Sequence, residues 1–336
     1  MVLASFPAIL SGCTGYWSTS SDKTPTETPS ETGTATSAES PTDSPTPEPK
    51  YSLIPTDSKS TAQSEVRANL SGRDCSGLTN EPAVCPGDDA RLSVSISADV
   101  ASLPEATVEI TIRNDADEEY EFNRYDWKFY KYDGEAWQFL APLTAPEPLR
   151  NVPPGETEAY RVTTERPDDE GSRSMKTRVL ESRLGPISAP GLGPGVYGFV
   201  NASGFFSEDD PLGFGATFGL SGEGPEIRPS DAVESVERDG GTLIVHGGAD
   251  EWEPKGFKVS FTDEGAATLL PEHVQLLDPL RNTLSYAATE GVDSIRYVTD
   301  GPDVNWALRY LDAVTPDGTS SYRFRDYRFE VEKAAP

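Results

Sequence analysis

The strongest constraint on the fold of this chain is an alternation of apolar and polar residues that recurs between residues 88 and 222. In the segments RLSVSISADV and ATVEITIRN, nearly every second residue is apolar. Because successive side chains of a β-strand point to opposite faces, this pattern predicts strands with one buried face. The apolar positions are Leu92, Val94, Ile96, Ala98, Val108, Ile110 and Ile112.

Turn signals separate the alternating segments. Asp133-Gly134 predicts a hairpin within YDWKFYKYDGEAWQFLAP, Pro154-Gly155 precedes another alternating segment, and LGPGVY opens a later one. We expect seven short strands and no helix in this region. The sequence therefore predicts a mainly β protein, with an antiparallel β-sandwich over residues 88–222.

The order of these turns and strands resembles bacterial immunoglobulin-like domains of exported lipoproteins, and the related sandwich of the intracellular proteinase inhibitor type. The segments NDADEEYEF, YDGEAW, PPGETEAY and LGPGVY carry the resemblance. It implies an Ig-like sandwich, and it makes proteinase inhibition through a sandwich loop an alternative function. The segment 165–186, with Arg173, Lys176, Arg178 and Arg183, is expected to be a long loop, either a contact site or a solvated surface.

Six aromatic residues lie close together in the predicted hairpin. Since alternate residues of a strand face opposite sides, one set of these side chains enters the core. The other set either forms an exposed patch for a protein or carbohydrate ligand or is simply exposed to solvent. The six residues are Trp127, Phe129, Tyr130, Tyr132, Trp137 and Phe139.

Residues 223–336 mix both periodicities and predict a small α+β domain. Strands are expected in GTLIVHGGA, GFKVSFTD, DSIRYVTD and SYRFRDYRFEVE, the last with aromatic and arginine residues on opposite faces. LLPEHVQLLDPLRNTLSYAAT indicates two short helices or one kinked helix, with Asp278 as N-cap and Pro279 at the first position of the second. PDVNWALRYLDAV is an amphipathic helix. The domain resembles uncharacterised domains of halophile surface proteins.

The N-terminal residues 1–13 contain an apolar stretch, too short to span a bilayer, that ends in LSGC. This ending resembles the lipobox of prokaryotic lipoproteins, although no Lys or Arg precedes the stretch. The resemblance implies cleavage before Cys13, attachment of a two-chain lipid to its thiol, and stable anchoring at the extracellular face of the cell membrane. Residues 14–65 are rich in Ser, Thr, Pro and Glu, which predicts a disordered stalk. A chance occurrence of LSGC is the alternative.

The remaining cysteines, Cys75 and Cys85, lie in a lead-in segment at residues 66–87. In an exported protein they are expected to form a disulfide with each other, and half of a metal site is the alternative. Two N-x-Ser sequons, at Asn69 and Asn201, are compatible with N-glycosylation of an exported chain.

The chain is strongly acidic, with 56 Asp and Glu residues against 28 Lys and Arg residues and a net charge of -28. The dispersed charge resembles the proteins of extreme halophiles, and a surface for cations or basic partners is the alternative. Nucleic acid is a poor partner, because phosphate binding requires a basic face.

Few residues offer catalytic chemistry. The two histidines, His246 and His273, fall in no metal or nucleophile motif. Asp115, Asp117 and Glu119 alternate after a strand and form a weak candidate for Ca²⁺ binding, without the glycine of an EF-hand.

We therefore expect a lipid-anchored cell-surface protein with a binding or envelope-structural role, no enzymatic activity and no cofactor. Its expected partners are membrane lipid, through Cys13, and a surface protein or glycan. A proteinase inhibitor and a surface hydrolase with an unrecognised site remain alternatives.

Overall fold

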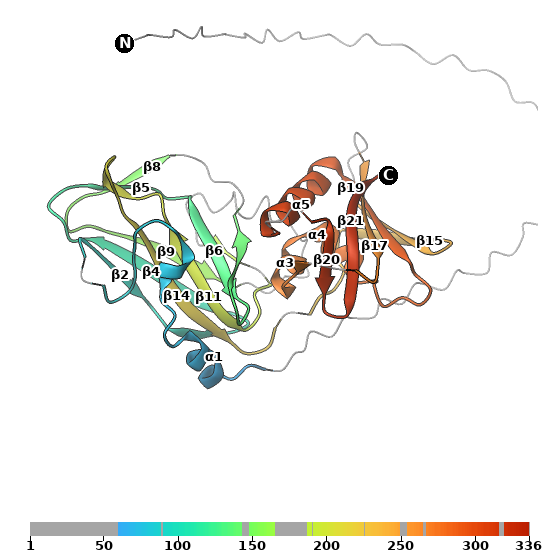
Figure 1. Cartoon of the computed structure of the whole chain (residues 1–336), viewed down its shortest axis with the longest axis horizontal. Helices are drawn as coiled ribbons and strands as arrows, with labels where there is room; N and C mark the ends of the chain where they lie inside the picture. Colours follow the sequence, from blue (N-terminus) through green and yellow to red (C-terminus); the bar gives the residue numbers. More distant parts are fainter. Residues whose placement is uncertain are drawn as a thin grey trace, which may run out of the picture. The chain divides into compact units, whose positions relative to one another are not determined.

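The computed structural model describes residues 60–88, 90–142, 148–164, 187–189, 191–224, 226–248, 254–264, 267–315 and 319–335. All of them belong to one compact unit. The fold of this part is mainly β, as the alternation predicts (Figure 1). Cys13, most of the expected stalk and the basic segment 165–186 lie outside the described residues. No described helix is long and apolar enough to cross a membrane.

The largest sheet of the sandwich contains the expected hairpin. In sheet order its strands are β1 (Ala83–Val84), β14 (Gly213–Ser221), β11 (Gly195–Asn201), β6 (Trp127–Tyr132) and β7 (Trp137–Ala141), and β3 (Val100–Ser102) also pairs with β14. Strands β6 and β7 are antiparallel, and Oδ1 of Asp133 accepts hydrogen bonds from the backbone N–H groups of Glu135 and Ala136, both at 2.8 Å. Gly134 adopts a φ of 112°, which glycine tolerates best.

Two further sheets of four strands complete the sandwich. One runs β10 (Ile187–Ser188), β9 (Thr157–Thr163), β4 (Thr107–Asn114) and β2 (Leu92–Ile96). The other runs β13 (Asp210–Pro211), β12 (Phe205–Ser207), β5 (Tyr120–Asn123) and β8 (Leu149–Val152). The described residues between 88 and 222 form strands and turns only.

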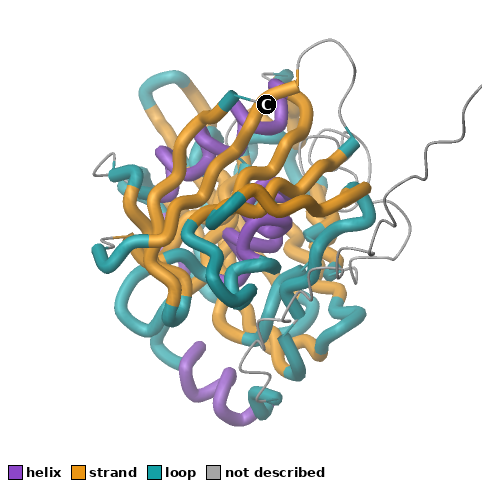
Figure 2. Tube along the Cα trace, turned by 90° about the vertical axis from the view of Figure 1, so that its right-hand side faces the viewer, coloured by secondary structure: helices purple, strands orange, loops and turns teal. Residues whose placement is uncertain are grey.

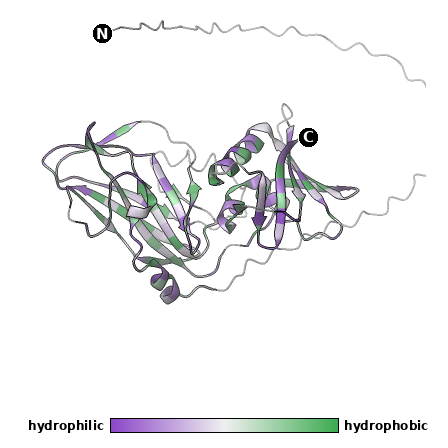
Figure 3. Ribbon diagram, in the orientation of Figure 1, coloured by the Kyte–Doolittle hydropathy of each residue, from purple (hydrophilic) through white to green (hydrophobic). Residues whose placement is uncertain are grey.

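The core of the sandwich follows from the alternation seen in the sequence. On β4 the side chains of Val108, Ile110 and Ile112 are buried, while the residues between them are partly exposed. Hydrophobic and hydrophilic residues alternate along the strands in Figure 3. Strand β14 differs, because eight of its nine residues are buried, and a strand buried on both faces needs a cover on its outer side.

That cover is the segment 60–88, which we call the strap. It contains the helix α1 (Gln63–Leu70), a 3₁₀ turn (Cys75–Leu78) and β1. Thr61 pairs with Gly222 beyond the end of β14, and α1 follows at Gln63, so residues 61–65, which were expected to belong to the disordered stalk, are folded onto the sandwich. Tyr132 and Trp137, from the hairpin, pack against buried residues of the strap.

Glycines on the outer face of the sheet let the strap approach. A Cβ atom on Gly198 would lie 2.5 Å from a methyl of Leu78, and one on Gly219 would lie 2.3 Å from Val66. Both distances are far below a van der Waals contact. Small residues at these positions are therefore a requirement of the strap's packing.

The C-terminal module is built on one sheet of seven strands, with helices on one face (Figures 1 and 2). In sheet order the strands are β15 (Val233–Asp239), β16 (Thr242–Gly247), β19 (Ser294–Asp300), β17 (Pro254–Phe261), β21 (Tyr327–Ala334), β20 (Ser321–Phe324) and β18 (Ala267–Thr268). The expected strands correspond to β16, β17, β19, β20 and β21. Strands β15 and β18 were not expected, because β15 is largely polar and β18 has only two residues.

The helices of this module confirm the sequence pattern. Two short helices, α3 (Pro271–Leu276) and α4 (Asp278–Leu284), replace a single kinked one, and α5 (Gly301–Val314) is the amphipathic helix. Asp278 is the first residue of α4 rather than its N-cap, which is Leu277. Tyr322, Phe324 and Phe329 are buried beneath the helices, whereas the arginines alternating with them on β20 and β21 are exposed.

Candidate functional site: a buried polar junction

The predicted disulfide between Cys75 and Cys85 is present, with a Cα–Cα distance of 5.6 Å. It joins the 3₁₀ turn of the strap to the end of β1, and both cysteines are buried. A Cβ atom on Gly215 would lie 3.2 Å from the Sγ atom of Cys75, so the disulfide rests directly on β14. The alternative of half a metal site is thereby wrong.

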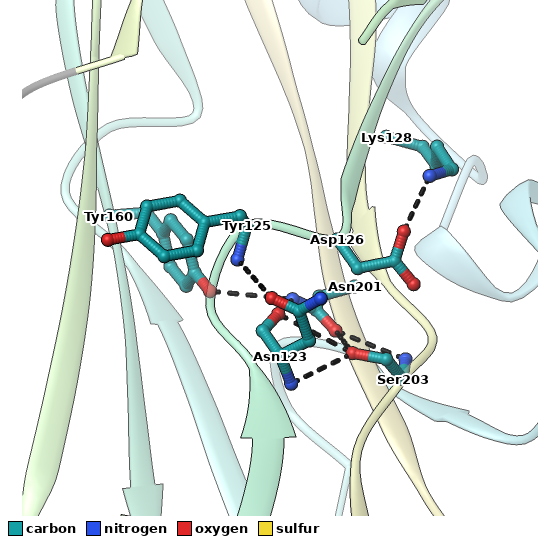
Figure 4. Close-up of polar contacts among 7 residues, drawn as sticks. All are labelled: Asn123, Tyr125, Asp126, Lys128, Tyr160, Asn201 and Ser203. Carbon is teal, nitrogen blue, oxygen red and sulfur yellow. Dashed lines mark hydrogen bonds and ion pairs between the residues drawn. The ribbon is translucent and has the colours of Figure 1, made fainter. Parts of the chain in front are cut away.

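The two sequons have different surroundings. Asn69 lies in the last turn of α1 with its side chain exposed. Asn201 is completely buried at the end of β11, and its Nδ2 donates to the carbonyl of Asn123 at 2.7 Å and to the Tyr160 hydroxyl at 3.4 Å (Figure 4). The expectation of a glycan at Asn201 is therefore corrected, since a glycan on this nitrogen is incompatible with its packing.

The acidic residues considered for Ca²⁺ do not converge. Asp115 pairs with Arg113 at 3.2 Å, and Glu119 accepts a hydrogen bond from the side chain of Asn151 at 3.2 Å. Among the described residues, which include Asp117, no group of three or more His, Cys, Asp or Glu side chains could hold a metal ion. The three residues lie in a bend between β4 and β5 in which Asp115 and Glu119 are engaged by other side chains, so the candidate Ca²⁺ site is not formed.

The hairpin aromatics do not form an open patch. Trp127 and Phe129 enter the sandwich core. Tyr132 and Trp137 point to the opposite face of the sheet. Their rings contact each other edge to face beneath the strap, with 5.4 Å between the ring centroids. The guanidinium of Arg73, from the strap, lies 4.0 Å above the Tyr132 ring. Tyr132 and Trp137 are therefore partly buried against the strap, which does not support the alternative of an exposed ligand patch at these two residues.

The two histidines lie in different elements and have different partners. His246 is on β16, half-buried, with Nε2 4.0 Å from the Glu237 carboxylate on the neighbouring β15. His273 is buried in α3, where Nδ1 accepts the backbone N–H of Leu270 at 3.2 Å and Nε2 donates to the carbonyl of Phe139 on β7 at 2.9 Å. Burial lowers the pKa of His273 to about 4, so its imidazole is neutral near pH 7.

The Phe139 contact belongs to a junction where α3 and α5 meet the sandwich. At its centre is Glu272, which is completely buried. Its Oε1 atom lies 2.5 Å from Nζ of Lys131 on β6 and accepts the backbone N–H of Gly193 at 2.9 Å. The hydroxyl of Tyr197, on β11, lies 3.0 Å from the same oxygen and donates to the carbonyl of Gly193 at 2.6 Å. We call these four residues the junction cluster.

The surroundings of Glu272 and Tyr197 determine which of the two is charged near pH 7. Burial by itself would raise the pKa of Glu272, but the Lys131 ammonium and the hydrogen bonds to the carboxylate hold this pKa below its usual value. Burial, and then the neighbouring carboxylate, raise the pKa of Tyr197 well above its usual value. The carboxylate is therefore ionised and the phenol neutral near pH 7. The ion pair of Glu272 with Lys131 therefore links α3 of the C-terminal module to β6 of the sandwich.

Neighbouring contacts extend the junction. The Tyr310 hydroxyl, on α5, donates to the carbonyl of Leu140 on β7 at 2.6 Å. The side-chain amide of Gln275, on α3, donates to the carbonyl of Glu226 at 2.6 Å. Gly195, with a φ of 148°, lies so close to Lys131 that a Cβ atom there would be 2.9 Å from its Cε. Because Gly195 has no side chain, it leaves room for the side chain of Lys131.

Sequence reasoning missed this junction. Glu272 and His273 are neighbours in LLPEHVQLL, and both fall between the apolar positions of the predicted helix. A charged residue inside an apolar helix was the available signal, because a carboxylate is rarely buried without a partner. Its partner, Lys131, lies 141 residues away in the sequence, and no local pattern connects the two.

A second polar network closes one end of the sandwich (Figure 4). Oδ1 of Asn201 accepts the hydroxyl of Ser203 at 2.8 Å, and Oδ1 of Asn123 accepts the backbone N–H of Tyr125 at 2.9 Å. The Tyr160 hydroxyl donates to the carbonyl of Arg124 at 2.9 Å. These bonds fasten the turn between β5 and β6 to the end of β11, which is a structural task.

Comparison with known proteins assigns no family. No protein-family model matches the chain, and no curated protein matches its sequence. Among solved structures, a β-glucosidase from Listeria innocua is similar in three crystal structures. The structure of a mutant with laminaribiose has 14% sequence identity over 39% of this chain and a TM-score of 0.18. The structure of the enzyme with glucose has 15% sequence identity over 39% of this chain and a TM-score of 0.16. A third structure has 16% identity over 38% of this chain and a TM-score of 0.17.

This chain corresponds to only 16% of each β-glucosidase chain. TM-scores this low carry no argument about fold or activity. The function has to be argued from the described residues themselves.

Proposed function

We propose that this protein is exported, is held at the extracellular face of the cell membrane by lipid on Cys13, and acts there as a non-enzymatic binding or envelope-structural protein. The observation that carries the proposal is the Cys75–Cys85 disulfide. Disulfides persist in oxidising compartments and are rare where thiols are kept reduced. A disulfide in the strap, which follows the Ser/Thr/Pro-rich segment in the sequence, supports export of the chain.

The junction supports the non-enzymatic part of the proposal. Glu272 and His273 are the buried acid and the buried imidazole of this region, and both are committed to holding α3 against the sandwich. A general base must be reachable by its substrate and have a pKa near the working pH, whereas Glu272 is completely buried and its pKa is lowered. Both nitrogens of His273 are engaged by backbone groups. These residues stiffen the unit, and a stiff unit on a long stalk suits the display of a binding or structural surface.

The test is the state of the N-terminus in protein purified from its native host. We expect the wild-type chain to enter the detergent phase in a phase-separation assay, and mass spectrometry to find it starting at a lipidated Cys13. The matched control is Cys13→Ser, which leaves the folded unit intact and is expected to enter the aqueous phase. Wild-type protein that stays in the aqueous phase with an unmodified Cys13 would contradict the proposal.

A further inference from the structure

The two sequons of this chain perform different roles in the fold. At Asn201 the sequon is part of the polar network in Figure 4, where Oδ1 accepts both the backbone N–H of Ser203, at 3.1 Å, and its hydroxyl, at 2.8 Å. Nδ2, the atom that would carry a sugar, is bonded to Asn123 and Tyr160 and is completely buried. The residue types of a sequon are used here to lock a turn.

At Asn69 the surroundings are the opposite. The side chains of Asn69 and Ser71, which are the first and third residues of the sequon, are both exposed. No hydrogen bond to another described residue engages the side-chain amide of Asn69, and only its backbone carbonyl accepts a bond, from Arg73. Nothing described around Nδ2 has to be removed before a large group is attached.

The backbone at Asn69 is also easy to present to an enzyme. Helix α1 has eight residues, and a helix this short is marginal by itself. It ends at Leu70, and Gly72 with a φ of 79° turns the chain away. Beyond the turn, the carbonyl of Arg73 accepts the hydroxyl of Thr217 at 2.8 Å, which fixes the strap to β14. Asn69 therefore lies one residue before the end of a short helix, next to the turn at Gly72.

We propose that Asn69, and not Asn201, carries an N-linked glycan in the native protein, at the point where the stalk meets the folded unit. The inference rests on the proposed export, because the transfer takes place outside the cytoplasm. The bond formed joins Nδ2 of Asn69 to C1 of the first sugar of a polyprenyl-linked oligosaccharide. The bond broken joins that C1 to the phosphate oxygen of the carrier. The polyprenyl phosphate leaves with the electron pair, and the amide gives up one proton.

Peptide mapping of the native protein tests this inference. Trypsin cleaves after Arg67 and Arg73 and releases the peptide ANLSGR, which contains Asn69. We expect this peptide to carry the added mass of an oligosaccharide, and the Asn201 peptide to have its unmodified mass. Asn69→Gln is expected to abolish the added mass completely. Ser71→Ala is the matched control that keeps Asn69, and it is also expected to abolish the added mass, because the transferase needs the hydroxyl residue.

Each outcome decides the inference. An unmodified ANLSGR peptide overturns it, and so does a glycan on Asn201 in folded protein. The lipid on Cys13 is measured in the same sample. A lipidated Cys13 with a bare Asn69 overturns the glycan alone, whereas loss of both modifications overturns the proposed export as well. A glycan on Asn69 without lipid on Cys13 supports this inference and overturns the anchor.

Discussion

At the scale of single residues, Glu272 is a buried carboxylate, and a buried charge is costly unless neighbouring groups compensate it. It has no access to solvent, and its charge is balanced by Lys131, whose side chain is 13% exposed. A buried ion pair adds little over a well-packed apolar pair, but losing one partner leaves an uncompensated charge. The junction is thus more sensitive to single substitutions than to paired ones.

Lys131→Met removes the ammonium and leaves the carboxylate buried. We expect the free energy of unfolding to fall by about 3–5 kcal/mol in denaturant titrations. The control is the double variant Lys131→Met with Glu272→Gln, which removes both charges at similar volume and is expected to recover most of this loss. A single variant within about 1 kcal/mol of wild type would show that the ion pair does not fasten the junction.

His273 predicts a pH dependence with a definite sign. Its pKa is about 4 in the folded protein and 6.5 when unfolded, so the unfolded state takes up a proton first as the pH falls. Stability is complete above pH 6.5 and is lost as the pH falls from 6.5 toward 4. Between pH 7.5 and 5 this one residue is expected to lower the free energy of unfolding by about 2 kcal/mol.

The measurement is denaturant unfolding of wild type and His273→Gln at both pH values. Glutamine keeps a side-chain N–H for the Phe139 carbonyl but does not titrate. Glu272 is present in both proteins, so its own titration contributes to both and largely cancels in the comparison. We expect the variant to lose about 2 kcal/mol less than wild type between the two pH values. Equal losses would contradict the role given to this imidazole.

At the scale of secondary-structure elements, the strap determines how much of the outer face of the large sheet is exposed to solvent. It covers β11 and β14 through close contacts at glycine, and its disulfide closes a short loop worth about 3 kcal/mol on a chain-entropy argument. The sandwich therefore includes its lead-in segment as a packed layer. The aromatic residues of the hairpin, Tyr132 and Trp137, gain a cover from it.

Gly198→Ala tests this layer. The new methyl would overlap Leu78, and overpacking of this kind costs about 1–3 kcal/mol in the free energy of unfolding. In a Leu78→Ala background the overlap is gone, so the same glycine substitution is expected to cost much less. A double-mutant cycle from thermal or denaturant unfolding measures the difference. Equal costs in both backgrounds would mean that the strap does not press on Gly198.

Across the whole molecule, the net charge opposes the compact state. A charge of -28 in one chain makes the folded protein repel itself, and salt screens that repulsion. The screening length falls from about 10 Å at 0.1 M to about 3 Å at 1 M salt. We expect the melting temperature to rise by roughly 5 °C or more over this range.

NaCl and KCl are expected to act alike, since screening depends on ionic strength alone. The measurement is the thermal transition followed by circular dichroism at each salt concentration. A melting temperature that stays constant or falls as salt is added would show that the dispersed carboxylates do not limit the stability of this protein.

The strands and helices with strict periodicity could be predicted from the amino-acid sequence without any knowledge of the fold. Leu92, Val94 and the apolar residues of β4 face the core, and the amphipathic pattern of α5 placed Val304 and Leu311 inside. Periodicity is a local property, and backbone geometry converts it directly into a buried face. The disulfide between Cys75 and Cys85 could also be predicted, since two cysteines in a short turn-rich segment most simply bond to each other.

The surroundings of the polar residues, in contrast, could be learned from the three-dimensional packing alone. Whether Glu272 is buried, whether Asn201 is accessible and whether Gly198 must be small depend on residues that are distant in the chain. These are Lys131, Tyr160 and Leu78, respectively. The cost of burying a polar group is set by the partners that packing brings to it, and a sequence pattern carries no record of those partners.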